Sequence, residues 1–256
     1  MQPLYPEWDA SAQIGALSTT RHGGVSAAPY DDGTGSGAGG LNLGSHVGDR
    51  LQDVEANRHV LQRFLPASPI WLNQVHGSHV VNAADVVSGV QADAIVATQP
   101  GLVCAILTAD CLPVLFCDTD GKVVGAAHAG WRGLASDVLE NTVAHMRAAG
   151  ADQVMAWLGP AIGPNRFEVG ADVLAAFVDR DAQAARAFQA ISGSAGKYLA
   201  DIYALARLRL ESVGVMRIYG GDCCTVSEPR FYSYRRDGVT GRMASLIWIK
   251  ESPAVA

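Results

Sequence analysis

The sequence predicts a mixed α/β fold of the α+β kind, in which packed mixed β-sheets are flanked by helices. Short apolar runs without polar alternation crowd residues 70–128, as is typical of strands buried on both faces. Apolar residues at helical spacing lie before and after that region. The expected strands do not alternate regularly with helices, as in a parallel α/β fold, and they do not occur only as hairpins, as in an all-β fold. No linker or composition break divides the chain, so we expect one domain over residues 1–256.

The first part of the chain predicts one strand, one loop and one helix. Residues 14–20 form an apolar strand run, and residues 31–40 are a Gly-rich stretch expected to be a surface loop. This stretch lacks the GKS/T ending of a phosphate-binding P-loop. Asp49 and Gln52 resemble a capping box, and Pro66 would close the following helix. Its apolar residues recur at helical spacing: Leu51, Val54, Leu61 and Phe64.

The rest of the chain is richer in strands. The buried strands expected up to residue 128 lie at residues 80–81, 94–96, 102–107, 114–116 and 123–124. The elements expected after them are a helix over 134–146 stopped by Gly150, a strand over 154–158, a helix over 169–178, an Ala-rich helical segment from 180 to the break at 192–194, a helix over 202–213, and strands over 215–219 and 244–249 before a frayed tail.

Composition and charge exclude several classes of protein. With 49% hydrophobic and 17% charged residues, the chain can bury a substantial core. A net charge of -6 argues against nucleic acid as a partner, because such binders present a basic face. No apolar run approaches the roughly 20 residues that span a bilayer, so we expect no membrane partner. The first residues lack the features of a signal peptide. We therefore expect a cytoplasmic protein, and we favour a monomer.

The cysteines do not form a disulfide or zinc-knuckle pattern. There are five, an odd number, and no CxxC pair occurs. Cys104 and Cys117 lie in apolar runs, so we expect them to be small buried side chains. A disulfide framework is not expected in a reducing compartment.

One cysteine and two histidines follow the ends of strand runs. His76 follows residues 71–75, Cys111 follows the run that ends at residue 107, and His128 comes 17 positions after Cys111. A hairpin could bring the last two together. Two imidazoles and a thiolate can hold zinc and leave a fourth position open for water or substrate, which is typical of catalytic zinc. Each residue alone would more often be a packing or surface residue, but the three together favour a metal site. His79 is a weaker fourth candidate.

Two aspartates and one arginine lie close to these candidates in the sequence. Asp110 and Asp93 could act as general base or orient a ligand imidazole, although either could instead cap a turn. Arg132 follows Gly130 between a strand and a helix, where a fork of donors suits an oxyanion or phosphate. The alternative is a glycine-permitted turn, with Arg132 paired to a surface carboxylate.

Aromatic and cationic side chains alternate near the C-terminus. Tyr234 and Arg235 belong to the segment 231–237, which mixes aromatic rings with two guanidinium groups. Such a strip could stack a flat base and bind an anion. It could equally be an edge strand with a solvated basic end.

Taken in order, these segments resemble the YfiH family, also called the laccase-domain or polyphenol oxidase family, which includes the peptidoglycan editing factor. The matching stretches are Thr20-Arg21-His22-Gly23-Gly24-Val25-Ser26, Leu41-Asn42-Leu43-Gly44, Val47-Gly48-Asp49, Gln74-Val75-His76-Gly77, Ala92-Asp93-Ala94, Thr108-Ala109-Asp110-Cys111-Leu112-Pro113, His128-Ala129-Gly130-Trp131-Arg132-Gly133, Leu158-Gly159-Pro160-Ala161-Ile162, Phe167-Glu168-Val169-Gly170, Phe231 to Arg236, and Gly241-Arg242-Met243-Ala244. The resemblance covers nearly the whole chain. The chain departs from it in a longer Gly-rich insert before Leu41 and in the doublet Cys223-Cys224.

This resemblance implies a CNF/YfiH-like fold and zinc bound by His76, Cys111 and His128. It implies purine nucleoside phosphorylase activity on adenosine, inosine, guanosine and methylthioadenosine, with adenosine deaminase activity alongside. The partners would then be purine nucleosides and phosphate. The residues we assign to catalysis are the three zinc ligands and Asp110. Those we assign to substrate or phosphate are Arg132, Asn42, Gln74, Arg21, Asp93, Tyr234 and Arg235.

Three other functions stay open at this point. Cys111 could be the nucleophile and His128 the base of a hydrolase that edits mis-made peptidoglycan precursors. Two histidines and one cysteine also match a blue-copper centre, so a copper-dependent polyphenol oxidase is a further alternative. Against copper, the seven histidines contain no His-x-His pair, whereas a multicopper cluster needs many clustered imidazoles. A non-enzymatic binding module is the least favoured, because it has no need for an open three-ligand site.

Overall fold

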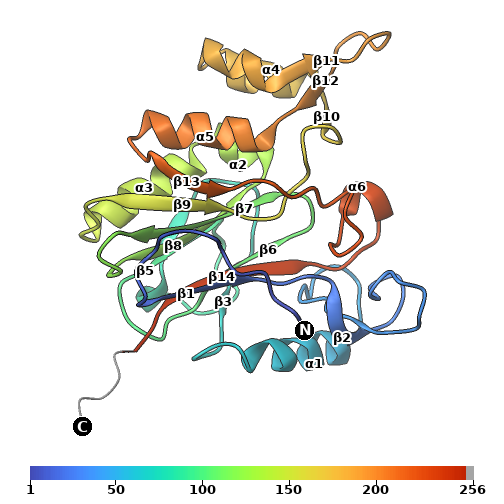
Figure 1. The fold of residues 1–256 in the computed structure, drawn as a ribbon, viewed down its shortest axis with the longest axis vertical. Helices are drawn as coiled ribbons and strands as arrows, with labels where there is room; N and C mark the ends of the chain where they lie inside the picture. The colour runs from blue at the N-terminus through green and yellow to red at the C-terminus, as the bar shows by residue number, and fades with distance from the viewer. Residues whose placement is uncertain (252–256) are drawn as a thin grey trace.

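Two β-sheets packed face to face form the centre of the molecule, and helices cover both outer faces (Figure 1). The computed structural model describes residues 1–251. The larger sheet contains six strands, in the spatial order β13 (Arg217–Gly220), β9 (Val154–Leu158), β7 (Leu112–Asp118), β8 (Val124–Ala129), β5 (Ala94–Ala97) and β4 (Val80–Asn82). The smaller sheet contains four strands, in the order β1 (Ile14–Ser18), β14 (Met243–Ile249), β6 (Cys104–Thr108) and β3 (Ile70–Trp71). Both sheets are mixed, and the predicted fold class is confirmed.

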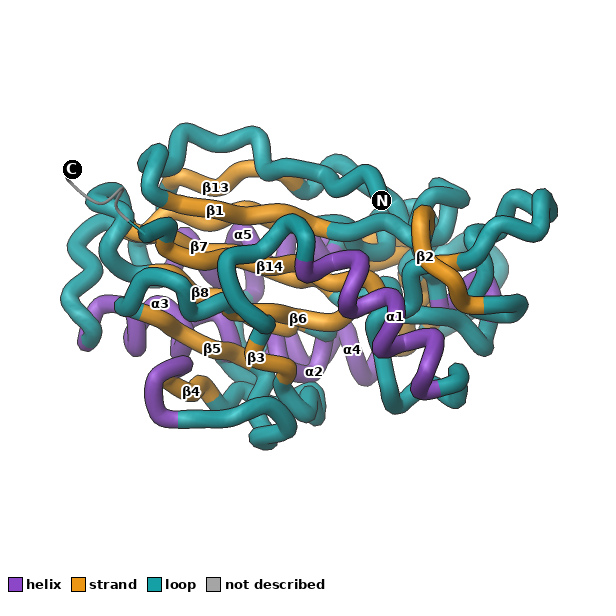
Figure 2. Tube along the Cα trace, turned by 90° about the horizontal axis from the view of Figure 1, so that it is seen from below, coloured by secondary structure: helices purple, strands orange, loops and turns teal. Residues whose placement is uncertain are grey.

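The helices form layers outside the sheets. Helix α1 (Leu51–Gln62) crosses the outer face of the smaller sheet (Figure 2). The outer face of the larger sheet is covered by α2 (Trp131–Ala135), α3 (Val138–Ala148) and α5 (Ile202–Ser212). Beyond these lie α4 (Ala171–Val178) and a small sheet of β10 (Glu168–Gly170), β12 (Lys197–Ala200) and β11 (Phe188–Ala190).

The remaining short elements lie at the ends of the sheets or in the connections. They are β2 (His22–Ser26), α6 (Tyr234–Asp237) and the 3-10 helices Ala83–Asp85 and Ala182–Ala187. None of the helices within residues 1–251 has both the length and the apolar character that crossing a bilayer requires.

The central strands are buried on both faces, which explains their continuous apolar sequence. In β7, Val114 and Phe116 face the helices, whereas Leu115 and Cys117 face the smaller sheet. A strand covered on both sides has no position for a polar side chain, so the alternation of polar and apolar residues disappears. Cys117 and Cys104 are buried, as predicted; they lie between the two sheets, and burial raises the pKa of both thiols to about 12.

Two boundary predictions around α1 are wrong. The capping box does not form, because the Asp49 carboxylate accepts hydrogen bonds from Ser26, Asn42 and the backbone N–H of Arg50. Arg50 is the N-cap residue, and its side chain makes no capping hydrogen bond. The helix ends at Gln62, before it reaches Pro66.

Three predicted helices also differ from the structure. The helix over 134–146 is two helices, α2 and α3, separated by Asp137 in the left-handed region at φ 71°. The Ala-rich segment 180–197 forms one 3-10 helix and then β11, because that strand pairs with β12. The helix expected over 169–178 begins at Ala171, since the preceding residues pair in β10. The frayed tail falls on residues 252–256, which lie outside the described residues.

Candidate metal centre

The hairpin of β7 and β8 brings the first two candidate ligands together. Its antiparallel register pairs Leu112 with Ala129 and Pro113 with His128. Cys111 immediately precedes β7, so its thiol lies beside the end of β8 that carries His128. The hairpin expected from the spacing of these two residues is therefore present.

The third candidate, His76, lies on a turn held by one buried carboxylate. Asp93 is fully buried at the start of β5 and accepts hydrogen bonds from three successive backbone N–H groups, those of Val75, His76 and Gly77, at 3.2, 2.9 and 2.7 Å. His76 has φ 61°, a left-handed conformation that residues other than glycine rarely adopt. The three hydrogen bonds stabilise this conformation and fix the turn.

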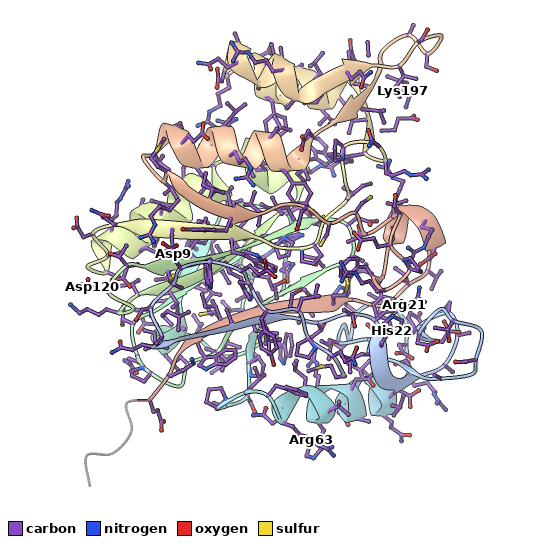
Figure 3. All side chains as sticks on the ribbon, in the orientation of Figure 1. Asp9, Arg21, His22, Arg63, Asp120 and Lys197 are labelled. Carbon is purple, nitrogen blue, oxygen red and sulfur yellow. The ribbon has the colours of Figure 1, made fainter. Side chains whose placement is uncertain are left out.

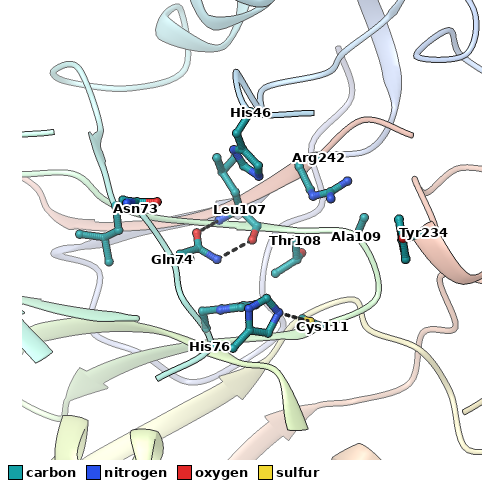
Figure 4. Close-up of a pocket in the computed structure, with 12 residues that line it drawn as sticks. His46, Asn73, Gln74, His76, Leu107, Thr108, Ala109, Cys111, Tyr234 and Arg242 are labelled. Carbon is teal, nitrogen blue, oxygen red and sulfur yellow. Dashed lines mark hydrogen bonds between the residues drawn. The ribbon is translucent and has the colours of Figure 1, made fainter. Parts of the chain in front are cut away.

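His76, Cys111 and His128 form one cluster of possible metal ligands. One ligand atom from each lies within 4.8 Å of the other two, and no other such group occurs within residues 1–251. The Cys111 Sγ lies 3.8 Å from His76 Nε2 (Figure 4), and the two imidazole rings have centroids 4.7 Å apart at 75°. His76 is exposed, Cys111 is half-buried and His128 is buried, so the cluster opens toward one side.

Asp93 also orients the second imidazole. Its Oδ1 lies 2.8 Å from Nδ1 of His128, which leaves Nε2 of that ring free to bind a metal. Metal-bound histidines commonly donate their other ring N–H to a carboxylate in this way. Asp93 is fully buried, lines neither cavity beside the cluster, and contacts both histidines of the cluster.

The cluster favours a thiolate. Burial alone would raise the pKa of Cys111, but the hydrogen bonds and positive charge of His128, and then of His76, outweigh it and lower the pKa to about 6. Burial lowers the pKa of His128, whereas its bonds to Asp93 and Cys111 raise it to about 9. At neutral pH the cysteine therefore offers an anionic sulfur, which is the form that binds metals.

Because Gly130 has no side chain, the space between His76, Cys111 and His128 stays open. A Cβ atom at this position would lie 2.9 Å from Cδ2 of His76, 3.1 Å from Sγ of Cys111 and 3.6 Å from Nε2 of His128. Its φ of -58° is ordinary for any residue, so glycine is needed here for space and not for backbone freedom. The donor set and this open space together fit a metal ion.

Gly130→Ala is therefore expected to lower metal affinity by about 10-fold or more, because the new methyl group displaces the ligands. The fold should persist, since alanine adopts this backbone conformation. Metal content and a competition titration with a chromogenic chelator would measure the effect. Ser192→Ala is the control, because this side chain is exposed and lies outside the cluster. An unchanged metal affinity in Gly130→Ala would show that the enclosed space is not where metal binds.

Two cavities meet at the cluster, and both are lined by His76, Ala109, Cys111 and Tyr234. The first, of about 350 Å³, is also lined by Leu72 and Leu107 and by the polar side chains of His46, Asn73, Gln74, Thr108, His128 and Arg242 (Figure 4). The second, of about 280 Å³, is also lined by Asp110, Trp131, Arg132, Ile162, Phe167, Ile202 and Arg235. The cluster thus lies between a cavity of mixed polar and apolar lining and one with mainly apolar and aromatic walls.

Four of the predicted substrate residues line these cavities. Gln74 lies in the first, where its amide exchanges two 2.8 Å hydrogen bonds with the backbone of Leu107. Tyr234 lines both cavities, and Arg235 and Arg132 line the second. The helix that contains Arg132 has only five residues, and its guanidinium group lies 4.5 Å from the centroid of the Trp131 ring.

Two other predicted residues hold the surrounding structure, and one of them, Asp110, also lines the second cavity. The Asp110 carboxylate accepts 2.6 Å hydrogen bonds from the Thr225 hydroxyl and from the backbone N–H of Arg235. Asn42 is fully buried, and its Oδ1 accepts from Gly44 and Arg242. Asn42 therefore contributes to the first cavity only indirectly, through its hydrogen bond to Arg242.

Arg21 lies elsewhere, near β2 (Figure 3). It is buried, it pairs with Asp31 at 3.3 Å, and it lines a separate cavity beside the Gly-rich stretch. The structure therefore does not bring Arg21 to the metal cluster.

Sequence reasoning missed His46 and Arg242, which both line the first cavity. Arg242 lies in one of the stretches that carry the family resemblance, but a single arginine before a strand gives no other local signal. Burial lowers the pKa of its guanidinium group.

Comparisons with known proteins agree with this arrangement. A family described as multi-copper polyphenol oxidoreductase laccase matches residues 15–250. The chain is 51% identical to purine nucleoside phosphorylase PA4543 of Pseudomonas aeruginosa, over 97% of this chain and 98% of that protein. It is also 51% identical to purine nucleoside phosphorylase YfiH of Escherichia coli, over 96% and 98% of the two chains.

Among solved structures, the Neisseria meningitidis protein NMB0706 is similar to this chain, with a TM-score of 0.89 and 50% identity, covering 98% of this chain and 100% of that one. The match over nearly the full length, in sequence and in fold, shows that the chain belongs to the multi-copper polyphenol oxidoreductase laccase family, which includes the YfiH proteins.

Proposed function

We propose that the protein is a zinc-dependent purine nucleoside phosphorylase that acts on adenosine, inosine, guanosine and methylthioadenosine, with adenosine deaminase activity alongside. The observation that carries the proposal is the His76–Cys111–His128 cluster at the junction of two cavities. The relatives named purine nucleoside phosphorylase, at 51% identity over nearly the whole chain, support this activity over the alternatives.

The donor set favours zinc. Two imidazoles and one thiolate would hold the ion and leave one position for a reactant. When bound, zinc supplies Lewis-acid chemistry beside the reacting atoms. The same donors also suit copper, as the family's description suggests, so the metal is part of the test.

Asp110 and Asp93 act through other residues in this proposal. Both carboxylate oxygens of Asp110 already accept hydrogen bonds, one of them from Arg235 at the start of α6. Asp110 therefore positions Tyr234 and Arg235 relative to Cys111, and it does not move a proton. Asp93 orients His76 and His128.

Phosphorolysis replaces the glycosidic bond of the nucleoside with a bond from C1′ to phosphate. A phosphate oxygen forms a bond to C1′ of the ribose while the C–N glycosidic bond breaks, and the electron pair of that bond goes to the purine nitrogen. The proton of hydrogen phosphate ends on the released purine, so the products are the free base and ribose 1-phosphate. The chain's own contribution is to bind and orient both reactants and to exclude water from the sugar.

Metal removal tests the proposal. Protein stripped with a strong chelator is expected to lose inosine phosphorolysis and adenosine deamination, and zinc should restore both. The stripped protein should remain folded, because Asp93 and the β7–β8 hairpin hold the ligands without metal. Chromatography of products with and without phosphate, beside circular dichroism, would measure this. Full turnover by metal-free protein, or restoration by copper with oxygen uptake on a phenol, would contradict the proposal.

A further inference from the structure

Arg242 is a partly buried cation without a carboxylate partner. Its Nη1 donates to the carbonyl oxygens of Thr240 and Gly241, and no acidic oxygen within residues 1–251 forms an ion pair with it. Its neighbours include the thiol of Cys111 and the carboxylate of Asp110, whose negative charges act on it from beyond pairing distance. A desolvated cation without a counter-ion favours an anionic ligand.

The loop before α1 holds this arginine in place. The backbone N–H of Arg242 donates to Oδ1 of the buried Asn42 at 2.8 Å. Its aliphatic chain packs on Gly44, where an added Cβ would lie 2.8 Å from Cγ of the arginine. The side chain is thus fixed along the wall of the first cavity before any ligand binds.

The first cavity is lined by one arginine, by neutral polar groups and by the Cys111 thiolate, and by no aspartate or glutamate. His46 lines the same space, where its imidazole is an exposed polar group. Asn73, Gln74 and Thr108 add neutral donors and acceptors (Figure 4). The cavity that contains Arg21 differs, because Asp31 and Asp237 pair with its arginines. Within the first cavity, Arg242 is therefore the guanidinium group available to an anion.

The second cavity suits a flat heterocycle instead. Trp131, Phe167 and Ile202 give it apolar walls, and Arg132 stacks on the Trp131 ring. Arg235 lies 5.9 Å from the ring of Phe167 and donates to the carbonyl oxygen of Glu168. Aromatic rings and stacked guanidinium groups bind the face of a base.

We propose, on the basis of the proposed function, that inorganic phosphate binds in the first cavity on Arg242 and His46, and that the purine binds in the second cavity. The ribose then lies over the side chains that both cavities share. Phosphate can approach C1′ from one side while the base leaves toward the other, as a direct displacement requires. Arg132 and Arg235 belong to the base site in this assignment, and not to the phosphate site.

Arg242→Gln tests the assignment in the zinc-loaded protein. Its KM for phosphate should rise by about 10- to 100-fold, because a charge-assisted bond is lost. Its KM for inosine should change far less, and adenosine deamination, which uses no phosphate, should persist. Arg242→Lys should give an intermediate KM for phosphate. Arg63→Gln, at an exposed arginine after α1, is the matched control.

A second variant tests the same assignment independently, in case Arg242→Gln does not fold. His46 is exposed, so His46→Asn should fold normally and raise the KM for phosphate by several-fold. An unchanged KM for phosphate in both variants would overturn the assignment, and an increase in Arg132→Gln would place phosphate in the second cavity. If the wild-type protein itself releases no base in the presence of phosphate, the proposed function fails, and the two failures are therefore distinguishable.

Discussion

Cys111→Ser is expected to reduce zinc affinity by more than about 100-fold and to abolish phosphorolysis at ordinary zinc concentrations. Loss of a group that only orients a metal ligand lowers affinity by about 10- to 100-fold, and loss of a ligand itself should exceed that. Serine keeps the shape of the side chain, but its hydroxyl does not ionise near neutral pH. Elemental analysis and an inosine assay over a range of free zinc would measure both effects.

Cys223→Ser is the control for this prediction. Cys223 is a half-buried thiol outside the cluster, so its loss should leave metal content and turnover unchanged. Normal zinc content and turnover in Cys111→Ser would refute the metal assignment. If Cys111→Ser is inactive while metal-free wild-type protein stays active, the sulfur acts as a nucleophile, and the hydrolase alternative is supported.

Asp93→Asn is expected to weaken zinc binding by about 10- to 100-fold and also to lower the free energy of unfolding by about 2 kcal/mol or more. The carboxylate accepts from the turn that carries His76 and from His128. An asparagine has one acceptor oxygen, and its NH₂ group must then face an N–H donor. Urea unfolding and a zinc competition titration on the same preparation would separate the two effects.

Asp120→Asn provides the comparison, because that exposed carboxylate pairs only with Lys122. It should change neither stability nor metal affinity by a measurable amount. Folded Asp93→Asn protein that binds zinc as tightly as the wild type would show that the buried carboxylate stabilises the turn without orienting the ligands.

The strands and two of the three clustered side chains could be predicted because their signals are local. A strand buried on both faces is a continuous apolar run, and a hairpin needs only two such runs separated by a turn. Cys111 and His128 lie at the ends of such runs, 17 positions apart, so the sequence itself indicates their proximity. The position of His76 could not be derived in this way, because it depends on a hydrogen bond to Asp93, the residue before β5.

Other features depend on contacts between distant residues, which local patterns do not contain. Residues 188–190 have an Ala-rich helical context, yet they pair with β12. Asp49 matches a helix cap in sequence, but Ser26 and Asn42 engage its carboxylate. Arg242 reaches the first cavity through Asn42, a residue 200 positions earlier. In all three cases, contacts between residues that are far apart in the sequence determine the local structure.

The junction of two cavities at one cluster has a kinetic consequence. Under the proposed assignment, each reactant has a compartment of its own, so neither must depart before the other enters. The enzyme would form a ternary complex, and double-reciprocal plots at several fixed phosphate concentrations should intersect. Covalent exchange through a modified enzyme would give parallel lines instead.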